Sequence, residues 1–169
     1  KAGIDIKKIK IIDAGNGNQM DTAFREGEGQ YIHQQGPAPQ QLAADGVGHV
    51  LAQLGPTIGA CGFSSLAATP AWLATDTARA FTRAYIETRD YMNDASASEI
   101  AKAEKPLFPD IDLEVLTDCI ATYQAMGCWT RHIDITQEGY DAMLDIFEYD
   151  GKLPHRYSYH QVCAPPPAI

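Results

Sequence analysis

The chain has 169 residues, with 22 acidic and 13 basic side chains and a formal net charge of −9. Its length and its 45% content of hydrophobic residues are typical of a globular protein of about one domain. The acidic balance disfavours nucleic acid and anionic membrane surfaces, which attract clustered Lys and Arg. No apolar run reaches the ~18 residues of a membrane span. The start at Lys1, without Met or a signal peptide, indicates a mature, trimmed or excised piece.

The first part of the chain predicts short strands that alternate with short helices. Runs of β-branched, aromatic and other apolar residues favour strands, and stretches rich in Gly, Asn and Pro interrupt them as turns. Met20 to Arg25 suits a brief helix, which ends near Gly27. A second short helix is expected from Gln40 to Ala44. The strands are expected at residues 9–12, 31–32, 49–52 and 63–66.

Beyond Pro70 the pattern predicts helices instead. Apolar residues recur at helical spacing over a long run, which predicts one helix over 75–93. Ser96 and Glu99 form a capping-box pattern for a short helix that extends to about Lys105. Two further helices are expected, one from an N-cap at Asp112 to a stop at Gly127 and one from Thr136 to Gly151.

The order of these elements resembles one known family. The resemblance lies in Gly3-Ile4-Asp5, Ala23-Phe24-Arg25-Glu26-Gly27 and Gly36-Pro37. The chain is similar to the second half of the ABC-transporter substrate-binding proteins of the nitrate, aliphatic-sulfonate and thiamine-pyrimidine-precursor type. It departs from the family pattern at Gln30, where an Asp is usual, and at Gly36, where a Glu is usual.

The resemblance implies an α/β, type II periplasmic-binding-protein-like fold with a helix-rich second half. This chain would hold the C-terminal portion, with part of each of two lobes. Residues 1–48 would be the remainder of the second ligand-binding lobe. Residues 49–169 would return into the first lobe and form its helical C-terminal part.

The first candidate site is the loop from Ala14 to Gln19, between an expected strand and an expected helix. Ligands of open α/β sheets lie outside the carboxyl ends of the strands. Free N–H groups around Gly15 and Asn16 would hold a polar or anionic group, and Gln19 both donates and accepts hydrogen bonds. In nitrate-type relatives a ligand-contacting Gln lies at the place of Gln19. The alternative is a tight turn followed by a solvated helix start.

Two further loops supply weaker candidates. The adjacent amides of Gln34 and Gln35 suit a neutral or weakly polar ligand better than a dianion, which would favour Arg. Their alternative role is to satisfy backbone groups in a strand-to-helix connection. Ser64 and Ser65 lie on the crossing back into the first lobe, where hydroxyls either meet a ligand or bond locally.

No catalytic or metal-binding arrangement is indicated. His132 and Asp134 would project to one face of an extended stretch, but no third ligand has a suitable spacing, so a surface pair is expected. The four cysteines, which allow three pairings, match neither a zinc nor a redox motif. They are Cys61, Cys119, Cys128 and Cys163.

The resemblance implies a solute-binding component of an ABC importer, either periplasmic or extracytoplasmic and membrane-associated. It would capture a small polar organic molecule or anion between two lobes and pass it to a membrane permease. It would perform no chemistry and need no cofactor. One alternative is an enzyme of thiamine-pyrimidine synthesis on the same fold, although the cysteine-rich motif of such enzymes is absent. Another is a fragment that binds no ligand and self-associates through apolar faces that a missing half would cover.

Overall fold

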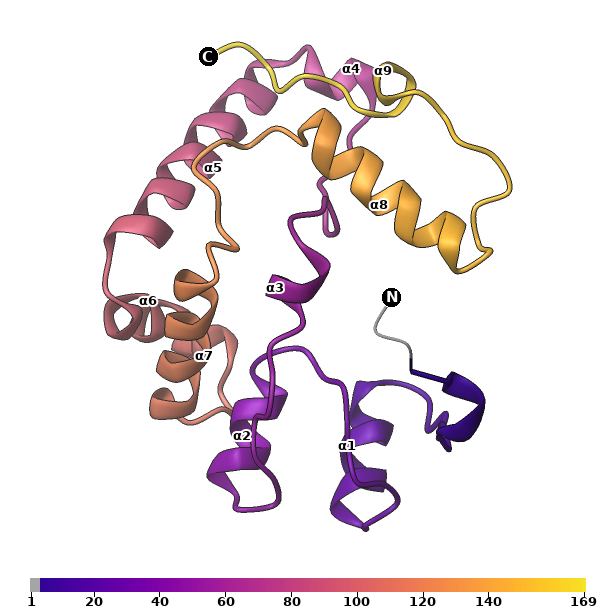
Figure 1. Ribbon diagram of the computed structural model, residues 1–169. Coiled ribbons are helices and arrows are strands. Elements are labelled where there is room, and N and C mark those ends of the chain that lie inside the picture. The colour runs from indigo at the N-terminus through magenta and orange to yellow at the C-terminus, as the bar shows by residue number, and fades with distance from the viewer. Residues whose placement is uncertain (1–3) are drawn as a thin grey trace.

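Helices are the only regular secondary structure in the part of the protein described by its computed structural model, residues 4–169. Gly3, which belongs to the family resemblance, lies outside the described residues. Just over half of the chain is helical (Figure 1). The helices are η1 (Ile6–Lys8), α1 (Gly17–Arg25), α2 (Ala38–Ala44), α3 (Gly55–Ile58), α4 (Pro70–Leu73), α5 (Asp76–Asp94), α6 (Ala97–Glu104), η2 (Lys105–Leu107), α7 (Leu113–Ala125), α8 (Gln137–Tyr149) and α9 (Tyr159–Val162).

The prediction of an α/β periplasmic-binding-protein-like fold is wrong, because residues 4–169 contain no strand. A strand exists only where a neighbouring segment completes its hydrogen-bond ladder. Residues 9–12, 31–32, 49–52 and 63–66 have strand-like side chains, but none of them lies in a ladder here. The division at residue 48 is not tested and stays a prediction.

The expected longer helices are present, and local capping explains their starts. The Thr75 side chain accepts a hydrogen bond from Ala78 N at the start of α5. Ser96 and Glu99 form the expected capping box of α6. Thr136 caps α8 by accepting from Gly139 N. Such caps satisfy N–H groups that the helix itself leaves free.

The main core lies where α6 packs against α7. Ile100 and Ala101 of α6 are fully buried against Leu116 and Ile120 of α7. Burying an aliphatic side chain of this size contributes about 1.5–3 kcal/mol relative to leaving it exposed. Partly buried residues, among them Trp129, extend the cluster. This pair of helices is therefore the best-packed part of the molecule.

The helix α2 packs against α7. The loop before α2 also approaches α7 closely. Gly36 N donates to the Tyr123 hydroxyl at 3.0 Å. A Cβ at Gly36 would lie 2.5 Å from Cys119 Sγ, so no side chain fits there without a shift. Gly36 is thus required for packing against α7.

The helices trace an open arc rather than a layered core (Figure 1). The long α5 leads along one side to α6 and α7, and α8 lies beyond the far end of α7. The segment with α3 runs through the open middle of this arc, and α1 lies at the indigo end of the chain. The chain has 12415 Å² of accessible surface, whereas a compact monomer of 18.4 kDa has about 8,200 Å².

The four cysteines are free thiols, and only Cys119 is buried. Burial, followed by the nearby Asp118 and Glu104 carboxylates, raises the pKa of Cys119 to about 11. Within residues 4–169, no helix combines the length and the hydropathy that a membrane span requires.

Candidate functional site

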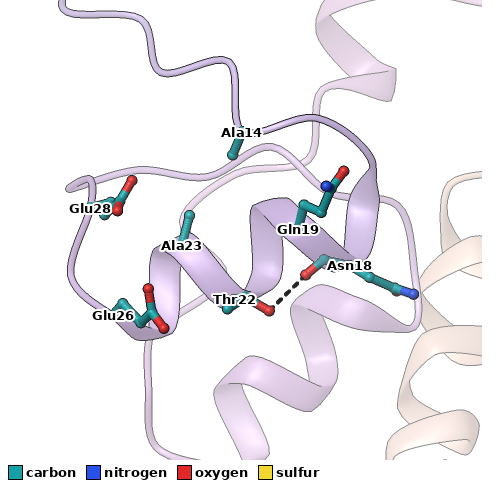
Figure 2. A pocket seen from close by; sticks show the side chains of 7 residues that line it. All are labelled: Ala14, Asn18, Gln19, Thr22, Ala23, Glu26 and Glu28. Carbon is teal, nitrogen blue, oxygen red and sulfur yellow. Dashed lines mark hydrogen bonds between the residues drawn. The ribbon is translucent and has the colours of Figure 1, made fainter.

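The candidate site is a hollow of about 390 Å³ along one face of α1 (Figure 2). The helix begins after Asn16, whose side chain accepts hydrogen bonds from Asn18 N and Gln19 N, both at 3.1 Å. The Gln19 Oε1 atom accepts in return from Asn16 N at 2.9 Å. This reciprocal cap fixes the Gln19 side chain at the first turn of the helix. The lining residues are Ala14, Asn18, Gln19, Thr22, Ala23, Glu26 and Glu28.

Gly15 permits this arrangement. Its φ of 100° lies in a region that side chains rarely adopt, and a Cβ there would lie 2.3 Å from Gln19 Oε1. The predicted roles of Gly15 and Asn16 in ligand binding are not tested. What the structure shows is that both residues build the start of α1 rather than line the hollow.

The amide and carboxylate groups of the hollow lie toward its two ends, with the Thr22 hydroxyl between them. Figure 2 shows Asn18 and Gln19 at the start of the helix, and the carboxylates of Glu26 and Glu28 at the other end. Gln19 and Glu26 are separated by seven positions, or about 10 Å along a helix axis. Ala14 and Ala23 lie between these ends.

The chemistry of the lining favours a ligand that donates hydrogen bonds at one end. The Gln19 amide keeps its Nε2 donor, since only Oε1 is used in the cap. The Thr22 hydroxyl donates to Asn18 O at 3.0 Å (Figure 2). Two carboxylates and no basic side chain line the hollow, and an inorganic anion would meet repulsion there.

The guanidinium of Arg25, on the same helix, is engaged elsewhere. Arg25 lies 2.6 Å from Asp21 and 2.8 Å from Asp45, which follows α2. The hydrogen bond from Arg25, together with a second from Gln41, lowers the pKa of Asp45. Arg25 therefore ties α1 to the end of α2 and does not line the hollow.

The structure brings the predicted loop around Gln34 next to the predicted loop from Ala14 to Gln19, but the two do not form one site. Gln34 Nε2 donates to Gly17 O at 2.7 Å, so this amide satisfies the backbone at the start of α1. Gln35 is exposed, and its side chain has no hydrogen bond within residues 4–169. Ser64 and Ser65 are exposed and likewise without hydrogen bonds in the described chain. None of these four residues lines the hollow, and their ligand contacts stay predictions.

Sequence reasoning named Gln19 but missed four lining residues, three on the same face of α1 and its C-cap and one beyond the helix. Thr22, Ala23 and Glu26 follow Gln19 at spacings of three, four and seven, which is the repeat of one helix face. That periodicity could have identified them once the helix was extended back to Gly17. Glu28 lies beyond the helix, and no local signal marks it.

The other paired polar groups are consistent with surface roles. His132 Nδ1 lies 3.4 Å from Asp134 Oδ1, and both side chains are half exposed. Among residues 4–169 no group of three or more His, Cys, Asp or Glu side chains is arranged to hold a metal ion.

Comparison with known proteins identifies a distant relative. Over 160 residues, 94% of this chain, the sequence is 27% identical to "Putative binding protein YtlA" of Bacillus subtilis (strain 168). The matched region is 47% of that protein, so the chain spans about half of its relative's length. No family model and no solved structure matches the chain. The similarity indicates a relationship to a binding protein without defining a substrate.

Proposed function

We propose that this protein binds a small polar organic molecule in the hollow beside α1. The observation that carries the proposal is the lining itself, with the Gln19 amide at one end and two carboxylates at the other. The relative's name supports a binding role in general terms. Such a lining favours a neutral or cationic molecule that bears an amine or amide, because carboxylates accept hydrogen bonds and repel anions.

The choice of ligand sharpens the broader prediction of a polar organic molecule or an anion. Nitrate, sulfonates and other anions become poor candidates at this hollow because of Glu26 and Glu28. An aminopyrimidine is a suitable probe, since it has ring nitrogens that accept from an amide and an amino group that donates to a carboxylate. The site acts by reversible binding and performs no chemistry.

We further propose that the bound solute is delivered to the membrane permease of an ABC importer from outside the cytoplasm. The support is the resemblance of Ala23 to Gly27 and of Gly36-Pro37 to that class of binding proteins. Deletion of the gene is expected to reduce uptake of the bound solute in the organism that encodes it. Unchanged uptake of a solute that the purified protein binds would contradict this role.

Isothermal titration with an aminopyrimidine, taurine and nitrate tests the binding proposal. Heat is expected with the aminopyrimidine and not with nitrate. Glu26→Gln should weaken binding about tenfold or more, since hydrogen bonds to charged groups contribute about 1.5–3 kcal/mol. Glu138→Gln, the same change at an exposed position of α8, serves as the matched control. Absence of heat with every probe, or equal affinities of the two variants, would overturn the proposal.

A further inference from the structure

A thirty-residue segment of the chain, residues 46–75, contains no Asp, Glu, Lys or Arg. The net charge of −9 is therefore distributed entirely over the rest of the molecule. None of the thirty residues is buried, and most are exposed. The exposed large apolar side chains of this uncharged segment are Val47, Val50, Leu51, Leu54, Ile58, Phe63 and Leu66.

The backbone of the uncharged segment is also unpartnered within the described residues, over residues 49–53 and again over residues 63–68. Residues 49–53 lie between α2 and α3 (Figure 1) and belong to no helix. Within residues 4–169, no backbone N–H or C=O of these five residues takes part in a hydrogen bond. A row of free backbone donors and acceptors beside exposed apolar side chains is a template for pairing with another chain.

We propose that two copies of this chain associate through the uncharged segment, with residues 49–53 of one copy pairing antiparallel with the same residues of the other. Pairing about a two-fold axis at Leu51, the central residue, uses all five residues of both copies. The inference goes beyond the proposed solute binding and does not depend on it.

A second copy fits this segment because antiparallel pairing matches the stretch with itself. Donors and acceptors alternate along a strand, so a stretch and its antiparallel copy are always complementary. Homotypic pairing places identical side chains opposite or near one another, and like charges there would destabilise it. Residues 4–12, an exposed apolar stretch outside the uncharged segment, carry Lys7, Lys8 and Lys10 and would suffer that repulsion.

The exposed area is sufficient for such a dimer. The chain exposes about 4,200 Å² more than a compact monomer of its mass. A standard protein interface buries about 1,600 Å² in total from both partners, and permanent dimers bury about 2,000–5,000 Å². The charges outside the segment oppose association only weakly, because the Debye length at physiological salt is about 8 Å.

Light scattering coupled to size-exclusion chromatography tests the proposal. The wild-type chain should elute as a discrete species of twice 18.4 kDa. Leu51→Glu places like charges opposite each other and should raise the dimer dissociation constant tenfold or more. The matched control is Leu107→Glu, since Leu107 is 77% exposed and Leu51 74% exposed. This control should remain a dimer.

Mixing opposite charges at the same position separates self-pairing from other occupants. Leu51→Glu and Leu51→Lys should each dimerise at least tenfold more weakly alone and should form a mixed dimer when combined. Circular dichroism of both variants should match that of the wild type, because the side chain is exposed. A wild-type monomer, a polydisperse aggregate, a dimer indifferent to Leu51→Glu, or failure of the mixture to associate would each overturn the proposal.

Discussion

Residues 97–125 and the uncharged segment, residues 46–75, are nearly equal in length but opposite in packing. The first stretch holds α6 and α7 and buries Ile100 and Ile120 in the main core. The second stretch buries no residue. Apolar content alone therefore does not decide burial. Helical spacing along α6 and α7 aligns apolar residues into one stripe. In the uncharged segment, α3 stops at Gly59 and α4 ends at Ala74, so each has only four residues and neither presents such a stripe.

The largest contrast is expected from truncating one apolar side chain in each region. Ile100→Ala should lower the free energy of unfolding by about 2–5 kcal/mol, because it leaves a cavity in the α6–α7 core. Leu66→Ala removes an exposed side chain and should change it by less than about 0.5 kcal/mol. Urea unfolding followed by circular dichroism measures both values. Equal costs would show that the two regions do not differ in packing.

Thiol labelling compares the core with the unfolded chain. Cys119 of α7 has a pKa raised from an ordinary value of 9.0 to about 11, chiefly by burial. At pH 8 its thiolate population is about a hundredfold lower than in the unfolded state, and the labelling rate of Cys119 should fall at least that much.

The raised pKa of Cys119 also makes the free energy of unfolding depend on pH. The contribution is complete below pH 9 and is lost as pH rises toward 11. Rapid labelling of Cys119 in the native protein would contradict its burial.

A methyl group added at Gly36 tests the contact that joins α2 to the core. Gly36→Ala should cost about 1–3 kcal/mol, since its Cβ would overlap Cys119 Sγ. In the double variant with Cys119→Ala, the added cost should be smaller. Gly55→Ala, in the uncharged segment, is the control, because its Cβ would meet only Met126 Sδ at 3.6 Å. Additive costs of Gly36→Ala and Cys119→Ala would sink the explanation.

The smallest expected effect comes from one helix cap. Ser96→Ala should lower stability by about 1 kcal/mol through loss of the α6 capping box. Hydrogen bonds from Ser96 lower the pKa of Glu99 below its ordinary value of 4.5. This contribution is present above pH 4.5 and is lost as pH falls through the lowered value. Ser64 is exposed and makes no hydrogen bond within residues 4–169. Ser64→Ala should therefore leave the stability unchanged both above and below pH 4.5.

The sequence predicted the long helices well because their signals are local. The expected helix over 75–93 is α5, and the Ser96–Glu99 capping box begins α6 as expected. Asp112 precedes α7 as its N-cap residue, but its side chain makes no capping hydrogen bond. Periodicity, caps and glycine stops all act within a few residues, so one sequence is enough to identify them.

The strands could not be predicted in the same way, because a strand depends on a partner far away in sequence or on another chain. Residues 49–52 have the side chains of a strand, but the described chain supplies no neighbour for them. At the candidate site, Gln19 was identified from its place before a helix, whereas Glu28 reaches the hollow only through the chain path after α1. That path is a tertiary property, and no local pattern encodes it.

The Arg25 bridge has a consequence for how the hollow responds to ionic strength. Arg25 joins α1 to Asp45 through partly exposed charges, and Gln34 adds one hydrogen bond to Gly17. Salt screens the attraction between Arg25 and Asp45 but leaves the apolar contacts of α6 and α7 in place. Added salt should therefore speed amide hydrogen exchange in α1 while exchange in α7 stays slow. The hollow would then loosen at high salt in a molecule whose core remains folded.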